Sequence, residues 1–178
     1  MLQSCSSDDN SASNDSNLKV GDFFQGGYIA YFFKQNEPGY IEGKQHGIIS
    51  ASIDQGEYKW TLCGKLFGTS TELGSGKENT FSMTNGCWGP NETTAAWVCS
   101  DLDKNGYSDW ILPSRADMEK VYNNLHLNGV GNFSSGVYWT SSEYDTYNAY
   151  GYRFANGGGD IKVSKTTIKL FVRAIRYF

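Results

Sequence analysis

The pattern of hydrophobic and polar positions changes at Lys19 and divides the chain into two parts. Residues 6–17 are Ser, Asp, Asn and Ala only, and they contain no large apolar side chain. Such a stretch has too little apolar surface to bury, so we predict that residues 1–18 form a disordered tether. From residue 19 to residue 178 apolar and aromatic side chains recur throughout, which predicts a single folded domain over this range.

Short runs of β-branched and aromatic residues between turn signals predict several strands in this domain. The first strand follows a turn within residues 20–33, and the second covers residues 46–51 and is expected to pair with it. Further strands are predicted at residues 137–142, 149–155, 161–164 and 168–177, with a hairpin turn at 156–159. The last of these carries apolar residues on both faces, which is typical of a central strand.

Two segments place apolar residues at helical spacing. In residues 92–102 these are Ala95, Ala96, Cys99 and Leu102, and in residues 114–125 they are Met118, Val121, Tyr122 and Leu125. The second helix is expected to start at Ser114, because Asp117 stands three residues later, as in a capping box. Residues 64–90 are rich in Gly, Ser, Thr and Asn, and we predict a long ordered loop there.

The composition favours an α+β domain with short strands. Aromatic residues make up 15% of the chain, with 21 Gly but only 3 Pro, and this mixture is typical of strands joined by tight turns. The formal net charge of −4 argues against nucleic acid as a partner, because phosphate backbones are bound by clustered Lys and Arg. The chain also lacks an apolar run of about 18 residues, so no membrane-spanning helix is predicted in it.

The start of the chain resembles a bacterial lipoprotein signal. Leu2-Gln3-Ser4-Cys5 matches the pattern after which signal peptidase leaves a lipidated cysteine, and the rest of the signal peptide is expected to have been trimmed from this sequence. The acidic residues after Cys5 resemble surface lipoproteins of the Bacteroidetes type. This resemblance implies a lipoprotein of the outer membrane, exposed at the cell surface and attached to the membrane only through the lipid on Cys5.

Four motifs in the folded part resemble the Legionella collagen-like protein C-terminal domain family, and they are also similar to the Fibrobacter major paralogous domain. They are residues 20–27 (VGDFFQGG), 106–114 (GYSDWILPS), 138–143 (YWTSSE) and 172–176 (VRAIR), so the resemblance covers nearly all of residues 19–178. It implies a C-type lectin-like fold, with short twisted antiparallel sheets, two helices and long ordered loops, on a surface protein. The namesake adheres to sulfated polysaccharides, but this chain has no Gly-x-y stalk, and that ligand is not carried over.

The residue types in these motifs are more typical of a structural role in the fold than of a binding or catalytic site. Arg173 and Arg176 are expected to pair with carboxylates such as Asp109 or Glu143. Enzyme signatures are poor, because His46 and His126 are the only histidines and neither lies in a nucleophile or zinc arrangement. Formylglycine-generating enzymes use a cysteine pair late in their fold, whereas no cysteine follows Cys99. We therefore predict a protein without catalytic residues and without a cofactor.

Two features leave alternatives open. Asp101, Asp103, Asn105 and Asp109 have the spacing of a calcium loop, but Leu112 stands where a bidentate acid is needed, and a helix end at Asn105-Gly106 explains the same residues without calcium. Among the cysteines we favour a Cys63–Cys87 disulfide, with Cys87–Cys99 as the rival pairing and Cys99 otherwise a buried thiol.

Exposed aromatic rings are the remaining indication of function. The rings of Trp60, Trp88, Trp139, Tyr144, Tyr147 and Tyr150 are too many to be all buried, and sugars stack on such rings. We predict a recognition face built from residues 143–160 and 64–90, with contacts from Trp88, Glu143, Tyr144, Asp145, Tyr147, Asn148 and Asn156. The expected function is adhesion to a glycan or extracellular polymer. The alternative is a structural component that binds a partner protein at the surface and no small ligand.

Overall fold

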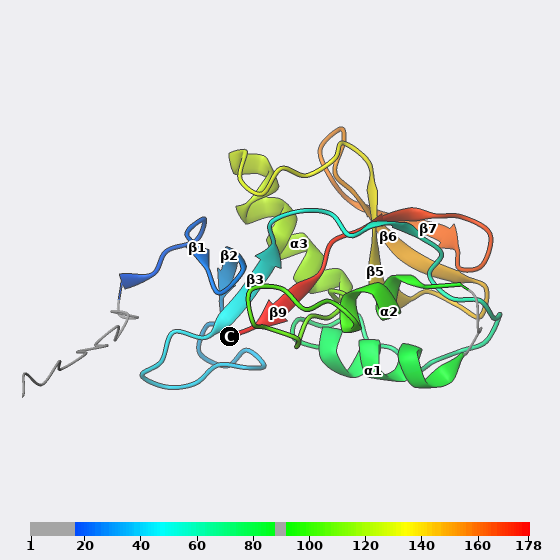
Figure 1. Ribbon diagram of the computed structural model, residues 1–178, viewed down its shortest axis with the longest axis horizontal. Coiled ribbons are helices and arrows are strands. Elements are labelled where there is room, and N and C mark those ends of the chain that lie inside the picture. The colour runs from blue at the N-terminus through cyan, green and yellow to red at the C-terminus, as the bar shows by residue number, and fades with distance from the viewer. Residues whose placement is uncertain (1–16, 88–91) are drawn as a thin grey trace, which may run out of the picture.

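The computed structural model describes residues 17–87 and 92–178 (Figure 1). Over these ranges it contains two β-sheets, three α-helices and a short 3-10 helix, η2 (His126–Asn128). The α+β class is therefore confirmed, with one helix more than the two that were predicted, while the likeness to C-type lectins stays a prediction. None of the helices in the described ranges is both long and apolar enough to cross a membrane.

The strands form a four-stranded and a five-stranded sheet. The first sheet is antiparallel, in the order β1 (Phe23–Phe24), β2 (Gly27–Phe32), β3 (Gly47–Ala51) and β9 (Ile175–Tyr177). The second has the order β4 (Gly56–Tyr58), β8 (Leu170–Val172), β5 (Val137–Glu143), β6 (Asn148–Arg153) and β7 (Asp160–Ser164), and in it β5 and β8 run parallel. The predicted pairing of the first two long strands is confirmed as β2 with β3.

The three helices are α1 (Gly76–Gly86), α2 (Ala95–Ser100) and α3 (Arg115–Asn124). The predicted capping box of α3 is confirmed, because the Ser114 hydroxyl accepts the N–H of Asp117 at 3.1 Å and the Asp117 carboxylate accepts the N–H of Ser114 at 2.9 Å. Helix α2 is shorter than predicted and ends at Asp101, its C-cap.

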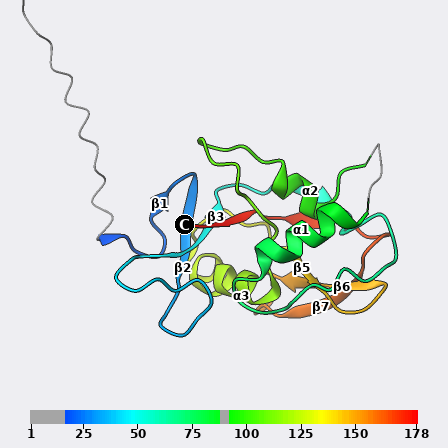
Figure 2. The same cartoon turned by 90° about the horizontal axis from the view of Figure 1, so that it is seen from below.

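The prediction that residues 64–90 are all loop was wrong, because α1 occupies part of them. The buried face of α1 consists of Gly76, Asn79, Thr80 and Met83, which have helical spacing but are mostly polar or small. Met83 packs in the apolar core, and hydrogen bonds serve the polar part of this face: the Asn79 amide donates to the Ser70 carbonyl at 2.7 Å and to the Ser141 hydroxyl at 3.0 Å. In both views α1 and α2 lie side by side (Figure 2).

The predicted last strand is two strands that belong to different sheets. β8 lies inside the five-stranded sheet and β9 lies at the edge of the four-stranded sheet, so the chain crosses between the sheets at Arg173 and Ala174. The Arg173 side chain is fully buried at this crossing and pairs with Asp54 at 2.7 Å. Of the predicted arginine partners, Asp109 is confirmed for Arg176 at 2.7 Å, whereas Glu143 pairs with neither arginine in the described residues.

The core lies on both faces of the five-stranded sheet. Tyr138 and Trp139 are neighbours on β5, so their side chains point to opposite faces. Trp139 packs with the buried residues of α1 and α2, and Tyr138 packs with those of α3. Helices therefore cover both faces of the five-stranded sheet.

Candidate functional site: the tip of the β5–β6 hairpin

The tight turn between β5 and β6 brings four of the predicted site residues together: Tyr144, Asp145, Tyr147 and Asn148. The Asp145 carboxylate accepts the N–H groups of Tyr147 at 2.8 Å and of Asn148 at 2.7 Å. Hydrogen bonds from the Asn148 side chain and these N–H groups lower the pKa of Asp145 below its ordinary value. Asp145 and Asn148 therefore stabilise the shape of the turn. The side chains of Tyr144 and Tyr147 are exposed to solvent.

Large side chains are exposed on this turn and on the loop before α1. Tyr147 is 71% exposed, Tyr144 is 45% exposed, and Leu66, from the loop before α1, is 60% exposed. The start of this loop lies near the turn, because a Cβ added to Gly64 would lie 3.5 Å from the Tyr147 ring. We use the name hairpin tip for these three exposed residues together with Lys162 of β7, which lies beside Tyr144.

Lys162 was missed by the sequence analysis. Its Nζ lies 3.6 Å from the centre of the Tyr144 ring, whose other neighbour, Tyr150, lies edge-on at 5.5 Å between ring centres. Lys162 of β7 pairs with Tyr150 of β6 in the sheet register. The sequence contains a signal that could have identified Lys162. The Gly-rich turn at 156–159 sets the register of the hairpin, and this register places Lys162 opposite Tyr150.

Glu143 was predicted as a ligand contact, but its side chain points into the protein and is only 7% exposed. Its carboxylate accepts three consecutive backbone N–H groups, those of Phe67, Gly68 and Thr69, and pairs with the Lys165 ammonium at 2.8 Å. Burial alone would raise the pKa of Glu143, but Lys165 and these N–H groups lower it below its ordinary value. Glu143 therefore fixes the loop that carries Leu66 and has no oxygen facing the solvent side of the tip.

The remaining predicted residues lie elsewhere. The rings of Trp60 and Trp139 are fully buried, and their indole N–H groups donate to the carbonyls of Thr140 and Tyr58, each at 2.7 Å. Asn156 was placed in the same recognition face, and this was wrong: it lies in the β6–β7 turn, at the other end of β6. Trp88 and Cys5 lie outside the described residues.

A disulfide braces the loop beside the tip. It joins Cys63 to Cys87, with Cα atoms 6.3 Å apart, which confirms the favoured pairing over Cys87–Cys99. Cys99 is free and buried, and burial raises the pKa of its thiol. The bond ties the start of the loop to the C-terminal end of α1, so the loop is held at Cys63 as well as at Glu143.

The candidate calcium loop at residues 101–109 contains a turn at Asn105-Gly106, and this turn is not the helix end that was the alternative, because α2 already ends at Ser100 with Asp101 as its C-cap. Asn105 and Gly106 adopt left-handed conformations with φ of 54° and 78°, and Lys104 and Tyr107 bond to each other across them. Asp109 is already paired with Arg176. Within residues 17–87 and 92–178 we find no group of three or more His, Cys, Asp or Glu side chains that could hold a metal ion.

No protein-family model and no curated protein matches the chain. The role of the hairpin tip must therefore be inferred from its own geometry.

Proposed function

We propose that this chain is a non-catalytic binding module of the bacterial cell surface and that its hairpin tip binds a glycan. The observation that carries the proposal is the Tyr147 ring, 71% exposed on a hydrogen-bonded turn that also carries Tyr144, which is 45% exposed. Solvent-exposed aromatic rings that cluster are typical of binding surfaces, and a sugar stacks the apolar face of its ring on them.

The polar groups of the tip suit the same ligand class. The phenol hydroxyls of Tyr144 and Tyr147 can each donate and accept a hydrogen bond, as sugar hydroxyls require. Lys162 adds three donors, and no carboxylate of the described residues lies within ion-pair distance of it. The tip thus combines stacking rings with hydrogen-bonding groups that are not used up internally.

The support beneath the tip favours binding without a large ordering cost. Glu143 holds the loop at Phe67, Gly68 and Thr69, and the Cys63–Cys87 disulfide holds it at its start. A surface that is rigid before binding loses less conformational entropy on binding, so more of the contact energy remains as affinity.

Neither histidine supports an enzyme. The His46 ring stacks on Phe33 at 5.7 Å and the His126 ring packs against Phe154 at 4.8 Å between ring centres, so both are part of aromatic packing. Burial also lowers the pKa of His46. These environments support a binding role for the domain in preference to acid–base chemistry.

The proposed setting is the outer face of the outer membrane, with Cys5 lipidated, in a member of the Legionella collagen-like C-terminal family. The Leu2–Cys5 motif supports the lipidation. Three of the motifs that resemble the family meet in the structure, because Gln25 of residues 20–27 and Asp109 of residues 106–114 both bind Arg176 of residues 172–176. The position of the tip is also suitable, because it lies at the right-hand end of Figure 1 and the described chain begins at the left-hand end.

A partner protein is the second candidate for the same tip. Leu66 is aliphatic and 60% exposed, and an exposed apolar side chain beside exposed aromatic residues is also typical of a protein–protein interface.

A glycan array with the soluble chain tests the proposal and separates the two candidates. We expect saturable binding that Tyr147→Ala abolishes and that Phe81→Ala leaves intact, since Phe81 of α1 is an equally exposed aromatic residue, at 70%, outside the tip. Silence across a broad array, with a surface protein retained by the wild type and released by Tyr147→Ala, would replace the glycan by a protein partner. Equal glycan binding by both variants would remove the tip as the binding site.

A further inference from the structure

The end of the molecule opposite the hairpin tip exposes a second set of large apolar side chains. They are Val20, Phe23, Tyr40 and Ile41, each between 39% and 56% exposed, and we call them the base patch. Val20 and Phe23 belong to the turn before β1 and to β1 itself, and the other two belong to the loop between β2 and β3. In both views these two segments lie at the end where the described chain begins (Figures 1 and 2).

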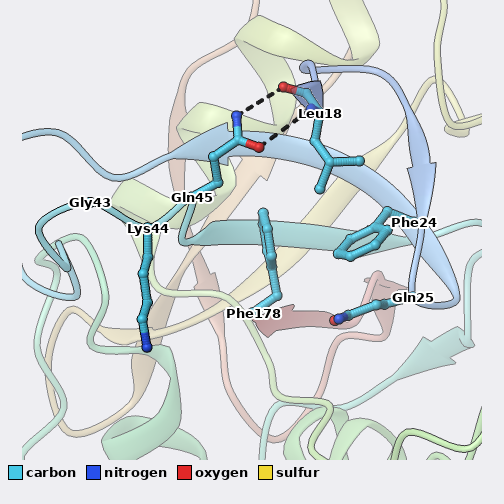
Figure 3. Close-up of a pocket in the computed structure, with 7 residues that line it drawn as sticks. All are labelled: Leu18, Phe24, Gln25, Gly43, Lys44, Gln45 and Phe178. Atoms are coloured by element: carbon cyan, nitrogen blue, oxygen red, sulfur yellow. Dashed lines mark hydrogen bonds between the residues drawn. The ribbon is translucent and has the colours of Figure 1, made fainter. Parts of the chain in front are cut away.

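The two segments that carry the base patch are joined and ordered. The Gln45 side chain, at the end of the loop, accepts the N–H of Leu18 at 3.3 Å and donates to the Leu18 carbonyl at 3.1 Å (Figure 3). The Phe23 ring packs edge to face on Tyr28 of β2, at 5.3 Å between ring centres. The exposed side chains are therefore presented by backbone that is already fixed, which lowers the entropy cost of a contact at this end.

The charges around the base patch balance. Residues 19–23 and 34–46 contain three lysines and three acids, namely Lys19, Lys34, Lys44, Asp22, Glu37 and Glu42. This end is therefore close to neutral, although the chain as a whole carries a formal charge of −4. Any contact made here depends on the apolar side chains and not on a net charge.

The position of the base patch favours a membrane as its partner, provided that Cys5 carries the proposed lipid. The chain from Cys5 to Asn17 spans at most about 40 Å even when it is extended, so the lipid would keep this end within that distance of the membrane. A tether of this length gives a local concentration in the millimolar range, at which a few apolar side chains are enough for binding.

From this position, which rests on the proposed lipidation, we infer that the base patch contacts the phospholipid surface, with Phe23 and Ile41 in the interfacial region. Tyr40 suits the same place, because tyrosine presents an apolar ring and a polar hydroxyl, and the lysine side chains can extend to the head groups. This contact would point the hairpin tip away from the membrane.

Phosphatidylcholine vesicles at millimolar lipid test the inference on the chain with Cys5→Ser, since this concentration matches the one that the tether would create. An environment-sensitive fluorophore is attached at Glu42→Cys, next to the base patch, or at Thr146→Cys on the β5–β6 turn; the buried Cys99 should not react. We expect a saturable blue shift at residue 42 and none at residue 146. Because the local charges balance, about 0.5 M NaCl should change the affinity by less than about twofold.

Two matched double variants locate the contact. Phe23→Ser/Ile41→Ser should weaken vesicle binding about tenfold or more, because two large apolar side chains no longer leave water. Leu66→Ser/Phe81→Ser removes two side chains that are exposed at least as much but lie outside the base patch, and it should bind like the wild type. All four positions are exposed, so both variants are expected to fold.

The inference is overturned if the blue shift does not saturate, if both labels shift equally, if both double variants bind equally, or if binding needs phosphatidylglycerol and is lost in salt. Sedimentation without vesicles tests another occupant: dimers that only Phe23→Ser/Ile41→Ser dissociates would replace the lipid surface by a second copy of the chain. The measurement uses neither Tyr147 nor Cys5, so its failure is distinguishable from failure of the proposed glycan site or of the proposed lipidation.

Discussion

At the scale of single residues, the ion pair of Glu143 and Lys165 lies almost out of contact with water, with side chains 7% and 0% exposed. Glu143→Gln leaves the Lys165 charge buried without its partner, and such a loss destabilises proteins by about 3–5 kcal/mol. Urea unfolding should show this loss, whereas Glu57→Gln, at an exposed position of β4, should change stability by less than about 0.5 kcal/mol. Adding Lys165→Met to Glu143→Gln should restore most of the loss, and failure to do so would show that the charge is not its cause.

The same carboxylate gives the stability a defined pH dependence. The pKa of Glu143 is lower in the folded protein than its ordinary value, so the unfolded chain binds more protons as the pH falls through this window. The stabilisation by Glu143 is therefore complete above the ordinary glutamate pKa and is lost as the pH falls through the lowered one. Denaturant unfolding of the wild type and Glu143→Gln at several acidic pH values should show the two stabilities converging. A constant difference would contradict the assignment.

The contrast between Ser114 and Glu143 shows which residue roles a sequence reveals. The Ser114–Asp117 capping box is local, since both partners stand within one turn of the chain, and it was predicted correctly. The partners of Glu143 are Lys165 and the backbone at residues 67–69, far away in the sequence. Without the fold, an acid beside exposed tyrosines is indistinguishable from a ligand contact.

At the scale of elements, the disulfide ties the loop at Cys63 to the end of α1. It spans a sequence separation of 24, and closing a loop of this length stabilises a protein by about 3 kcal/mol in the chain-entropy model. We expect the variant Cys63→Ser/Cys87→Ser to lose about this amount in urea unfolding. Wild type treated with a phosphine reductant should lose the same amount, and the variant should be insensitive to it. A stability that the reductant leaves unchanged would contradict the bond.

The element that the sequence concealed is α1, and the reason is physical. Its large apolar residues, Phe81 and Met83, stand two positions apart and so point to different sides of a helix. The buried face of α1 can be identified only from its contacts in the fold, such as the hydrogen bonds of Asn79 to Ser70 and Ser141. Hydrophobic periodicity detects helices that pack through apolar contacts, as α3 does, and it misses helices that dock through hydrogen bonds.

At the scale of the whole molecule, the order of strands decides which surfaces can act together. Consecutive turns of an antiparallel meander lie at opposite ends of the shared strand, so the β5–β6 and β6–β7 turns cannot meet across β6. The sequence predicted the hairpin turn at 156–159 and the strands on both sides of residues 143–148, yet treated residues 143–160 as one face. The correct separation requires the strand pairing, which assigns Tyr147 and Asn156 to different surfaces.

The same layout predicts how attachment to a membrane affects binding, and this prediction depends on the proposed glycan site. In Figure 1 the described chain begins at the end opposite the hairpin tip. Coupling Cys5 to maleimide-bearing vesicles should therefore leave glycan affinity within about twofold of the soluble value, since no contact at the tip is covered. Coupling the variant Cys5→Ser/Thr146→Cys, at the turn itself, should abolish binding that the same variant shows in solution. Undiminished binding in the second orientation would show that the tip is not the contact surface, and loss in the first would move the contact to the end where Leu18 lies.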